Sequence, residues 1–309
     1  MAEISVLMPV YNGMPYLVDA VNSILSQTIQ NFNFLIINDG STDETKNYLN
    51  QLNDPRINVI HQSNRGQGAA KNAGLDLCQT EFVAMMDADD ASFPTRLEKQ
   101  WNFLSQHQEV GMVGTKIVYF TTRGRKGFSP PLPCDHKTIY ADLLRGEHAI
   151  CQASLMCRTT ILKKVGGFRI DGSGEDLDMW LRMGEVSSLA NLDKVLLGVR
   201  LHFSSVNVRH QVEIRARYAH SLHSAKRRAE GQPELSYPEF LFLYRARSFW
   251  QRLAETVDIY SHSQYRQALV EILDNNLVRG YTRLAWAALC SPPRSIQRIS
   301  RALRRYRKI

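Results

Sequence analysis

The chain of 309 residues is long enough for one large domain, or for one domain with an extension. A hydrophobic fraction of 44% allows a sizeable core, and no apolar run approaches the roughly 18 residues of a membrane-spanning helix. The net charge of +8 is unevenly placed: residues 275–309 hold nine Lys or Arg and no acid, which leaves 29 basic and 30 acidic residues in 1–274. Basic character therefore belongs to the C-terminal tail.

The cysteines and the first residues bear on the compartment. The five cysteines form no CxxC pair, which is typical of reduced thiols rather than a disulfide framework. The chain enters a strand-like apolar run at Ile4 without the basic leader of a signal peptide. Both features predict a cytoplasmic protein.

The first hundred residues alternate between apolar runs and segments with helical spacing. Leu17, Ala20, Val21 and Ile24 recur at the spacing of one helix face, and Ser41 or Thr42 can cap a second helix. This order is typical of an α/β fold with a mostly parallel central sheet flanked by helices. We expect strands over 4–10, 32–37, 57–60 and 82–86, and further helices over 66–77 and 95–104.

The remainder of the chain is less regular. We expect a long strand or a strand pair over 110–120, a short strand over 154–156, and helices over 159–165 and 177–183. The last hundred residues read as helical. After Ser291, four apolar residues are spaced by 3, 4 and 3 positions, and arginines stand between them. This pattern predicts a basic amphipathic helix. Such a tail suits an anionic membrane surface or plain solvent, whereas the nearly neutral body makes nucleic acid an unfavoured partner.

Polar side chains follow three of the expected strands. Tyr11-Asn12 follows the first strand, Asn38-Asp39-Gly40 the second, and three carboxylates between Asp87 and Asp90 the fourth. The carboxyl ends of parallel strands meet at one sheet edge, where ligands bind. Clustered carboxylates need a counter-charge, and a divalent cation with oxygen ligands provides one while leaving room for phosphate oxygens. The alternative is a solvated acidic turn.

Other residues near this edge have both a functional and a structural interpretation. Asp39 can accept the imide N–H of a nucleotide base or form an ordinary Asx turn. Lys71, in a glycine-containing helix start, suits a diphosphate. The pattern Gly-x-Gly-x-x-Gly of a dinucleotide fold is incomplete here and follows the third strand, so an oxidoreductase is disfavoured.

Two later segments also contain candidate groups. Asp176, in the pair Glu175-Asp176, can take a proton from an acceptor hydroxyl, although acids also favour the first turn of a helix. His202 has strand-like neighbours and can face either the core or the site. Trp180 can stack on a sugar ring or pack in the core.

Seven segments that occur in order over residues 4–206 resemble the inverting family 2 glycosyltransferases, which have the GT-A fold. The segments are SVLMPVYNGMPYL, FLIINDGSTDET, NRGQGAAKNAG, MDADDASFPTRLEKQ, GGFR, GEDLDMWLR and VRLHFSSV. The resemblance implies a GT-A nucleotide-diphospho-sugar transferase domain over 1–206. A helical C-terminal extension with the basic amphipathic tail would then occupy 207–309.

The resemblance also implies roles for single residues. Asp176 corresponds to the catalytic base, and Asp89 and His202 to ligands of Mg²⁺ or Mn²⁺. Expected to bind the nucleotide sugar are Pro9, Tyr11, Asp39, Lys71, Asp87, Ala88 and Glu175. The metal, together with Lys71, would stabilise charge on the departing nucleotide diphosphate.

The implied reaction is metal-dependent transfer, with inversion, of a hexosyl or N-acetylhexosaminyl group in polysaccharide biosynthesis. A UDP-sugar is the favoured donor, and the acceptor is a hydroxyl of a saccharide or a lipid-linked saccharide. The enzyme is expected in the cytoplasm, peripheral at the inner face of the membrane. The Gln-x-x-Arg-Trp motif of processive synthases is missing, which favours transfer of one or a few sugars.

Two alternatives remain at this stage. A nucleotidyltransferase would have a glycine- and lysine-rich loop directly after the first strand, and Tyr11-Asn12-Gly13 is no such loop. A non-catalytic nucleotide-sugar-binding protein would share the binding residues but release no nucleoside diphosphate.

Overall fold

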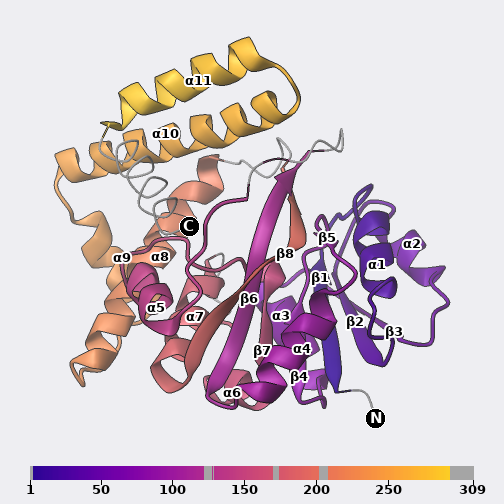
Figure 1. Cartoon of the computed structure of the whole chain (residues 1–309). Coiled ribbons are helices and arrows are strands. Elements are labelled where there is room, and N and C mark those ends of the chain that lie inside the picture. The colour runs from indigo at the N-terminus through magenta and orange to yellow at the C-terminus, as the bar shows by residue number, and fades with distance from the viewer. Residues whose placement is uncertain (1–2, 122–126, 128, 170–173, 202–207, 293–309) are drawn as a thin grey trace. The chain divides into compact units, whose positions relative to one another are not determined.

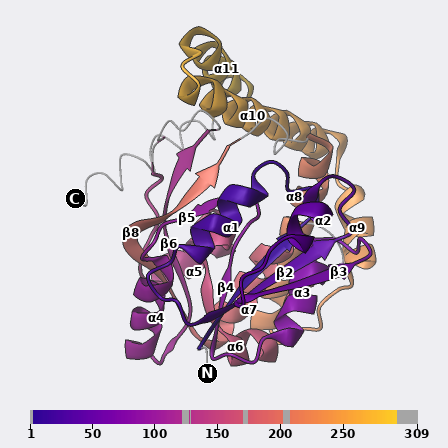
Figure 2. The same ribbon diagram turned by 90° about the vertical axis from the view of Figure 1, so that its right-hand side faces the viewer.

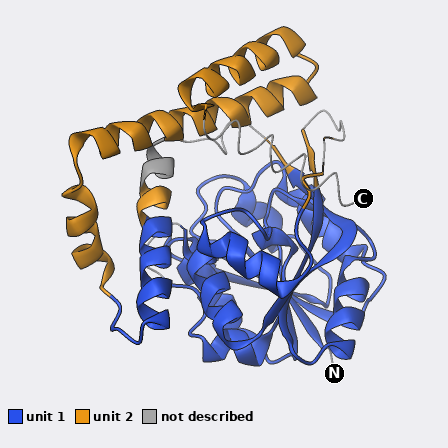
Figure 3. Cartoon of the chain, turned by 60° about the vertical axis from the view of Figure 1, so that its left-hand side comes forward, with its two compact units in different colours: residues 1–117, 132–199, 217–234 blue, residues 118–131, 200–216, 235–309 orange. Residues whose placement is uncertain are grey.

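The computed structural model describes residues 3–121, 127, 129–169, 174–201 and 208–292, with the backbone alone for 208–212. The chain forms two compact units (Figure 3). The first comprises residues 1–117, 132–199 and 217–234, and the second comprises 118–131, 200–216 and 235–309. Residues 217–234 of the predicted extension thus belong to the first unit, and a domain boundary at residue 206 stays a prediction.

The described strands form one eight-stranded sheet in the order β3-β2-β1-β4-β7-β6-β8-β5 (Figure 1). Strands β1 to β3 and β4 run parallel to one another, whereas β7 is antiparallel to β4, β6 to β7 and β5 to β8. The strands are β1 Ile4–Val10, β2 Phe32–Asp39, β3 Ile57–Gln62, β4 Phe82–Met85, β5 Ala91–Ser92, β6 Val110–Phe120, β7 Met156–Arg158 and β8 Ser188–Arg200.

Helices cover both faces of this sheet, as the uninterrupted apolar runs of its parallel strands require. On β1, Leu7 lies in the core cluster with side chains of α3, α5, α6 and α7, while its neighbours Val6 and Met8 are equally buried on the other face. Figure 2 shows these helices beside the sheet. The bounds are α1 Leu17–Leu25, α2 Thr45–Asn50, α3 Gln67–Leu77, α4 Arg96–Gln106, α5 His136–Leu144, α6 Thr159–Lys164 and α7 Glu175–Val186.

The parallel α/β pattern predicted for the first hundred residues is confirmed, although the short strand β5 was not predicted and the start of α2 differs. Helix α2 begins at Thr45 and has no side-chain cap from Ser41 or Thr42. Ser41 Oγ instead accepts a hydrogen bond from the Asn12 N–H at 2.9 Å, and the Thr42 N–H donates to Asn12 Oδ1 at 2.8 Å. These bonds join the loops behind β1 and β2.

The middle of the chain differs more from expectation. Residues 110–120 form one strand rather than two, and the expected strand at 154–156 lies at Met156–Arg158. Helix α5 and the 13-residue strand β8 were not predicted. Strand β8 carries Asp193 and Lys194 among apolar residues, so its sequence lacks a clear alternation.

The predicted helical character of the C-terminal part is confirmed as far as residue 292, where the description ends. The helices are α8 Val208–Ala229, α9 Tyr237–Arg245, α10 Phe249–Leu273 and α11 Leu277–Cys290. Helices α10 and α11 pack against each other in the second unit, where a Cβ on Gly280 would lie 2.5 Å from Ile272 Cγ1. The predicted basic tail lies outside the described residues apart from its first two positions. Within the described part of the chain, no helix is both long and apolar enough to cross a bilayer.

Candidate active site

The polar strand ends do meet at one edge of the sheet. Asp39, the last residue of β2, is 3% exposed. Its Oδ1 accepts hydrogen bonds from Gln62 Nε2 at 2.6 Å and from the Arg65 N–H at 2.9 Å, and its Oδ2 accepts one from the Gly66 N–H at 2.9 Å. A carboxylate has about four acceptor positions. Asp39 therefore holds the loop before α3 and retains an acceptor position for a further donor.

Lys71 and Glu175 form a buried ion pair beside this loop. Lys71 Nζ donates to Glu175 Oε1 at 2.8 Å, and both side chains are 3% exposed or less. The ammonium also lies 5.1 Å from the centre of the Phe168 ring. Burial acts to lower the pKa of Lys71, but the charges of Glu175, Asp176 and Asp87 outweigh it and raise the pKa. Lys71 is therefore a fixed cation within an acidic cluster.

The carboxylates behind β4 belong to the same cluster. Burial raises the pKa of Asp87 to about 6; the Lys71 charge opposes this shift, while Asp89, Asp176 and Glu175 add to it. Five charged groups from β4, α3 and α7 thus act on one another, and four of them are acids. Such an excess of negative charge favours binding of a cation.

Asp176 lies in the first turn of α7, next to the ion pair. The Leu177 N–H donates to its Oδ1 at 3.1 Å, and Tyr218 of α8 places its hydroxyl 3.5 Å from the same oxygen. Burial raises the pKa of Asp176, Lys71 lowers it, and Glu175 raises it further; the net direction is upward. A carboxylate with a raised pKa is a better proton acceptor, as a general base requires.

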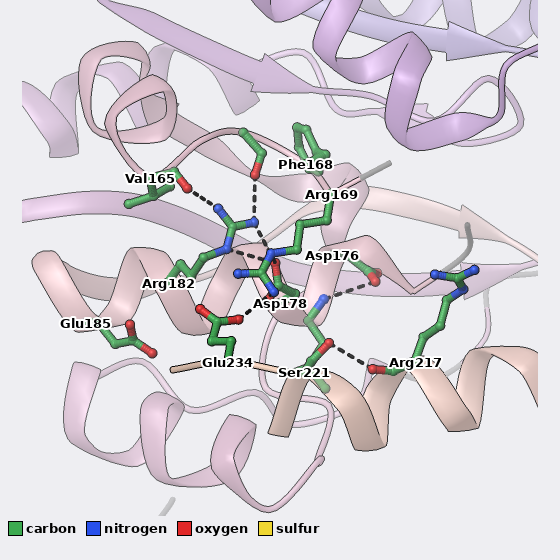
Figure 4. A network of polar contacts seen from close by, with 12 residues as sticks. Val165, Phe168, Arg169, Asp176, Asp178, Arg182, Glu185, Arg217, Ser221 and Glu234 are labelled. Carbon is green, nitrogen blue, oxygen red and sulfur yellow. Dashed lines mark hydrogen bonds and ion pairs between the residues drawn. The ribbon is translucent and has the colours of Figure 1, made fainter. Parts of the chain in front are cut away.

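Helix α7 is held in place beyond Asp176 by a network of buried charges (Figure 4). Asp178 Oδ2 accepts from Arg182 Nε at 2.8 Å and lies 3.3 Å from Arg169 Nε. Arg182 also donates to the carbonyl oxygens of Val165 and Gly167. The turn that ends α6 and the first turns of α7 are therefore tied together.

The residue after Lys71 joins this turn to α3. Asn72 donates from Nδ2 to the Phe168 carbonyl oxygen at 2.6 Å and accepts at Oδ1 from the Phe168 N–H at 2.9 Å. Adjacent residues of α3 thus fix both the turn before α7 and the first residue of α7. This connection sets where Asp176 lies relative to Asp87.

A second cation lies beneath the acidic strand end. Arg96 is fully buried, and its guanidinium donates to the carbonyl oxygens of Ala153 at 2.6 Å and Met85 at 3.1 Å. Burial lowers the pKa of Arg96 to about 10, while Cys151, Asp90 and Asp87 act in the opposite direction. Arg96 holds the end of β4 from which the acidic cluster projects.

The donor chemistry of this edge fits a divalent cation. Asp87 and Asp89 offer carboxylate oxygens, the ligands that Mg²⁺ and Mn²⁺ prefer. Among the residues that the structure describes, no three His, Cys, Asp or Glu side chains are grouped to hold a metal ion. His202, the predicted third ligand, lies outside the described residues. Asp87 and Asp89 are the described carboxylates that would hold such an ion.

The other predicted binding residues lie as follows. Pro9 is a buried residue of β1, Tyr11 is 53% exposed just behind that strand, and Ala88 lies half-buried between the two aspartates. Their contacts with a donor, like those of Lys71 and Glu175, stay predictions. Trp180 is 3% exposed and donates from Nε1 to Gln152 Oε1 at 3.0 Å, so it packs in the core and is not a sugar platform.

The sequence interpretation assigned no site role to Asn72 or Tyr218. Asn72 was within a matching segment, directly beside Lys71, but its contact with Phe168 spans 96 residues. Tyr218 was in the predicted extension, where no local pattern distinguishes it from its neighbours. Arg96 was likewise assigned no site role.

Comparison with known proteins identifies the class. The profile of glycosyl transferase family 2 matches residues 5–166, which is more than half of the chain. The chain is 32% identical over 209 residues to the "Putative glycosyltransferase EpsE" of Bacillus subtilis, covering 64% of this chain and 73% of that protein. Three further relatives are matched over only 33%, 33% and 29% of their own lengths.

Solved structures agree on the fold. Residues 1–349 of TarS from S. aureus superpose with a TM-score of 0.57 at 18% identity, covering 92% of this chain and 90% of those TarS residues. TarS has been solved with UDP and with UDP-GlcNAc. The mannosyltransferase PcManGT from Pyrobaculum calidifontis, solved with GDP-Man and Mn²⁺, has a TM-score of 0.53 at 18% identity, covering 97% of this chain and 80% of that one. This chain belongs to glycosyl transferase family 2 and has the GT-A fold.

Proposed function

We propose that this glycosyltransferase moves a sugar from a nucleotide-diphosphate donor to a hydroxyl group by direct displacement with inversion. The observation that carries the proposal is the meeting of Asp176, Asp87 and Lys71 in one charged cluster at the carboxyl edge of the sheet. Asp176 takes the proton of the acceptor hydroxyl as its oxygen attacks the anomeric carbon. The raised pKa of Asp176 supports this role.

The donor binds along the strand ends. Asp39 accepts the imide N–H of the base with the acceptor capacity that its three hydrogen bonds leave. Asp87 contacts the ribose, and Asp89 with His202 ligates the cation. When bound, Mg²⁺ or Mn²⁺ neutralises charge on the leaving diphosphate. Lys71, whose ammonium is held in place by Glu175, contributes a positive charge to the same region.

A UDP-sugar is the favoured donor. Asp39 presents an acceptor to the base, which suits the imide N–H of uracil, and the structurally similar TarS binds UDP-GlcNAc. The acceptor is a saccharide or a lipid-linked saccharide; a saccharide is supported by the similarity to a chondroitin synthase of Escherichia coli, 28% identical over 212 residues. A cytoplasmic enzyme held peripherally at the inner membrane face fits these acceptors.

The first experiment identifies the donor and the base. Thermal shifts are measured with UDP- and GDP-sugars, with and without Mn²⁺, and the best donor is then assayed for release of nucleoside diphosphate. Asp176→Asn should lower kcat by at least about two orders of magnitude while leaving the donor-induced thermal shift near normal. Asp193→Asn, an exposed aspartate with 71% of its side chain accessible, is the matched control.

Three outcomes would contradict the proposal. Undiminished transfer by Asp176→Asn would assign the base to another group. Retention of the anomeric configuration, measured by NMR on the product, would exclude single displacement. Release of pyrophosphate instead of nucleoside diphosphate would indicate a nucleotidyltransferase.

A further inference from the structure

Residues 217–234, which include most of α8, belong to the same compact unit as the proposed active site. Ala225 lies in the core cluster that contains residues of α7, and Tyr218 and Leu222 pack against that cluster. With Arg228 these residues are spaced by 4, 3 and 3 positions, which is the repeat of one side of a helix. One side of α8 therefore packs on the unit that carries Asp176.

Tyr218 lies against the beginning of α7. Its hydroxyl is 3.5 Å from Asp176 Oδ1, and a Cβ on Gly174, the residue before α7, would lie 3.2 Å from the Tyr218 ring. Hydrogen bonds between oxygen atoms are usually about 2.5–3.0 Å long, so this one tolerates little further separation. The position of α8 along α7 therefore decides how well Tyr218 acts on Asp176.

A group of ion pairs, the Arg228 cluster, fixes the other end of α8. It consists of Arg169, Glu185, Arg228 and Glu234. Arg228 donates to Glu185 through two parallel bonds, from Nη2 to Oε1 at 2.8 Å and from Nε to Oε2 at 2.9 Å. Its Nη1 lies 3.0 Å from Glu234 Oε1, and Arg169 Nη1 lies 2.7 Å from Glu234 Oε2 (Figure 4). A two-bond arginine–carboxylate pair fixes direction as well as distance.

The cluster is largely shielded from water. The side chains of Arg228 and Glu185 are 19% and 27% exposed, unlike the ion pairs of an open surface, which contribute little. Burial acts to raise the pKa of Glu234, but the hydrogen bonds and charges of Arg169 and Arg228 outweigh it and lower this pKa to about 2. The pairing therefore persists at neutral pH.

The two contacts are spaced alike on both helices. Asp176 and Glu185 are nine residues apart on α7, and Tyr218 and Arg228 are ten residues apart on α8. At 1.5 Å per residue these separations are about 13.5 Å and about 15 Å. The helices are therefore joined at both ends in the same direction, and sliding α8 by one residue would move Tyr218 by about 1.5 Å along α7.

We infer that the Arg228 cluster sets the position of α8 along α7 and thereby holds the Tyr218 hydroxyl at Asp176. Arg228 and Glu185 are positioning residues, which act on the reaction through Tyr218 without touching the substrate. The inference rests on the proposed role of Asp176 as the base. It adds a distant determinant of how fast that base works.

The first test separates turnover from donor binding in the full-length protein, with UDP-GlcNAc and Mn²⁺ or the nucleotide sugar that replaces it after the thermal-shift panel. Arg228→Met should lower kcat about fivefold, because small displacements at a reacting group are costly. The donor KM and the donor-induced thermal shift should stay within about twofold of the wild type, since Asp39, Asp87 and Lys71 lie on other elements. Lys226→Met, which removes an exposed cation of the same helix, is the matched control and should keep the wild-type kcat.

The second test is a double-mutant cycle with Tyr218→Phe. Residues as far apart as Tyr218 and Arg228 ordinarily act independently, so that their reductions in kcat would multiply. If Arg228 acts through Tyr218, Tyr218→Phe/Arg228→Met should instead be about as slow as Tyr218→Phe alone. Because Arg228→Met leaves two carboxylates without their partner, Glu185→Gln is measured beside it and should show the same non-additivity with a smaller loss.

Each remaining outcome has one meaning. Reductions that multiply would show that Arg228 acts by another route, and a wild-type kcat in both Arg228→Met and Glu185→Gln would show that the cluster does not position Tyr218; either result overturns the inference. Asp176→Asn is assayed in the same series. If it abolishes transfer while the cycle is additive, the proposed function stands and the positioning role alone fails. Undiminished transfer by Asp176→Asn would instead overturn the base assignment and the inference with it.

Discussion

Lys71 Nζ and Glu175 Oε1, 104 residues apart in the sequence, lie 2.8 Å apart in the interior of the first unit. The pair joins α3 to α7, the helix that carries Asp176. A buried charge that loses its oppositely charged partner destabilises the fold strongly, because it stays out of water without compensation. The pair therefore ties the position of the proposed base to an intact α3.

Removing one charge of this pair should greatly lower the protein's free energy of unfolding. Lys71→Met leaves Glu175 buried without its cation and should cost about 3–5 kcal/mol in the free energy of unfolding, measured by denaturant titration. The double variant Lys71→Met/Glu175→Met should recover much of that loss but not the transfer activity. Lys226→Met, in an exposed pair with Glu230, should change stability by less than about 1 kcal/mol. A single variant as stable as the wild type would show that the pair is dispensable.

The acidic cluster should make stability depend on pH. The folded-state pKa of Asp87 is about 6 and its usual value is 3.8, so the folded state binds a proton more tightly than the unfolded state. The contribution of Asp87 to stability is fully present below pH 3.8 and is lost as the pH rises through 6. Asp87→Asn should therefore raise the melting temperature at pH 7 while weakening donor binding. A lower melting temperature at pH 7 would contradict this account of Asp87.

The raised pKa of Asp176 should make the activity depend on pH as well. Because the pKa of Asp176 is raised, the acid limb of the pH profile of kcat/KM should lie above the range of an ordinary aspartate. The Tyr218 hydroxyl donates to the ionised carboxylate and stabilises it, so Tyr218→Phe should move the limb to higher pH and reduce kcat several-fold. Tyr244→Phe removes a tyrosine bonded to Glu255 in the second unit and should leave the limb in place. A limb that moves equally in both variants would rule out a specific effect of Tyr218.

Arg96 should be intolerant of replacement, even by lysine. Its planar guanidinium reaches the carbonyl oxygens of Met85 and Ala153 together, which a lysine ammonium cannot reproduce. Arg96→Lys should lower the free energy of unfolding by about 2 kcal/mol or more and weaken Mn²⁺ binding by loosening the end of β4. Lys99→Met, one turn along α4, should be nearly neutral. If folded Arg96→Lys protein binds Mn²⁺ as tightly as the wild type, Arg96 does not contribute to the cation site.

Much of the site was predictable because its residues follow strands. Asp39, Asp87 and Asp89 stand directly behind apolar runs, and in a parallel sheet all such positions meet at one edge. Helix α1 was predicted from the spacing of apolar residues such as Leu17 and Ile24, and the bounds expected for α3 and α4 are within a few residues of the observed ones. Strand β8 was not predicted because its apolar and polar residues do not alternate. The burial of its residues depends on contacts with distant parts of the chain, which a local sequence pattern does not contain.

The sequence by itself determined the class of protein, the parallel half of the sheet and the candidate acids, because these depend on local periodicity and on short segments in a fixed order. Only the tertiary structure decided which charges act together. Lys71 contacts Glu175, Asn72 contacts Phe168, and Tyr218 approaches Asp176, and the partners of each pair are at least 42 positions apart in the sequence. Such pairings depend on how distant elements pack, and burial then converts them into shifted pKa values that no local pattern contains.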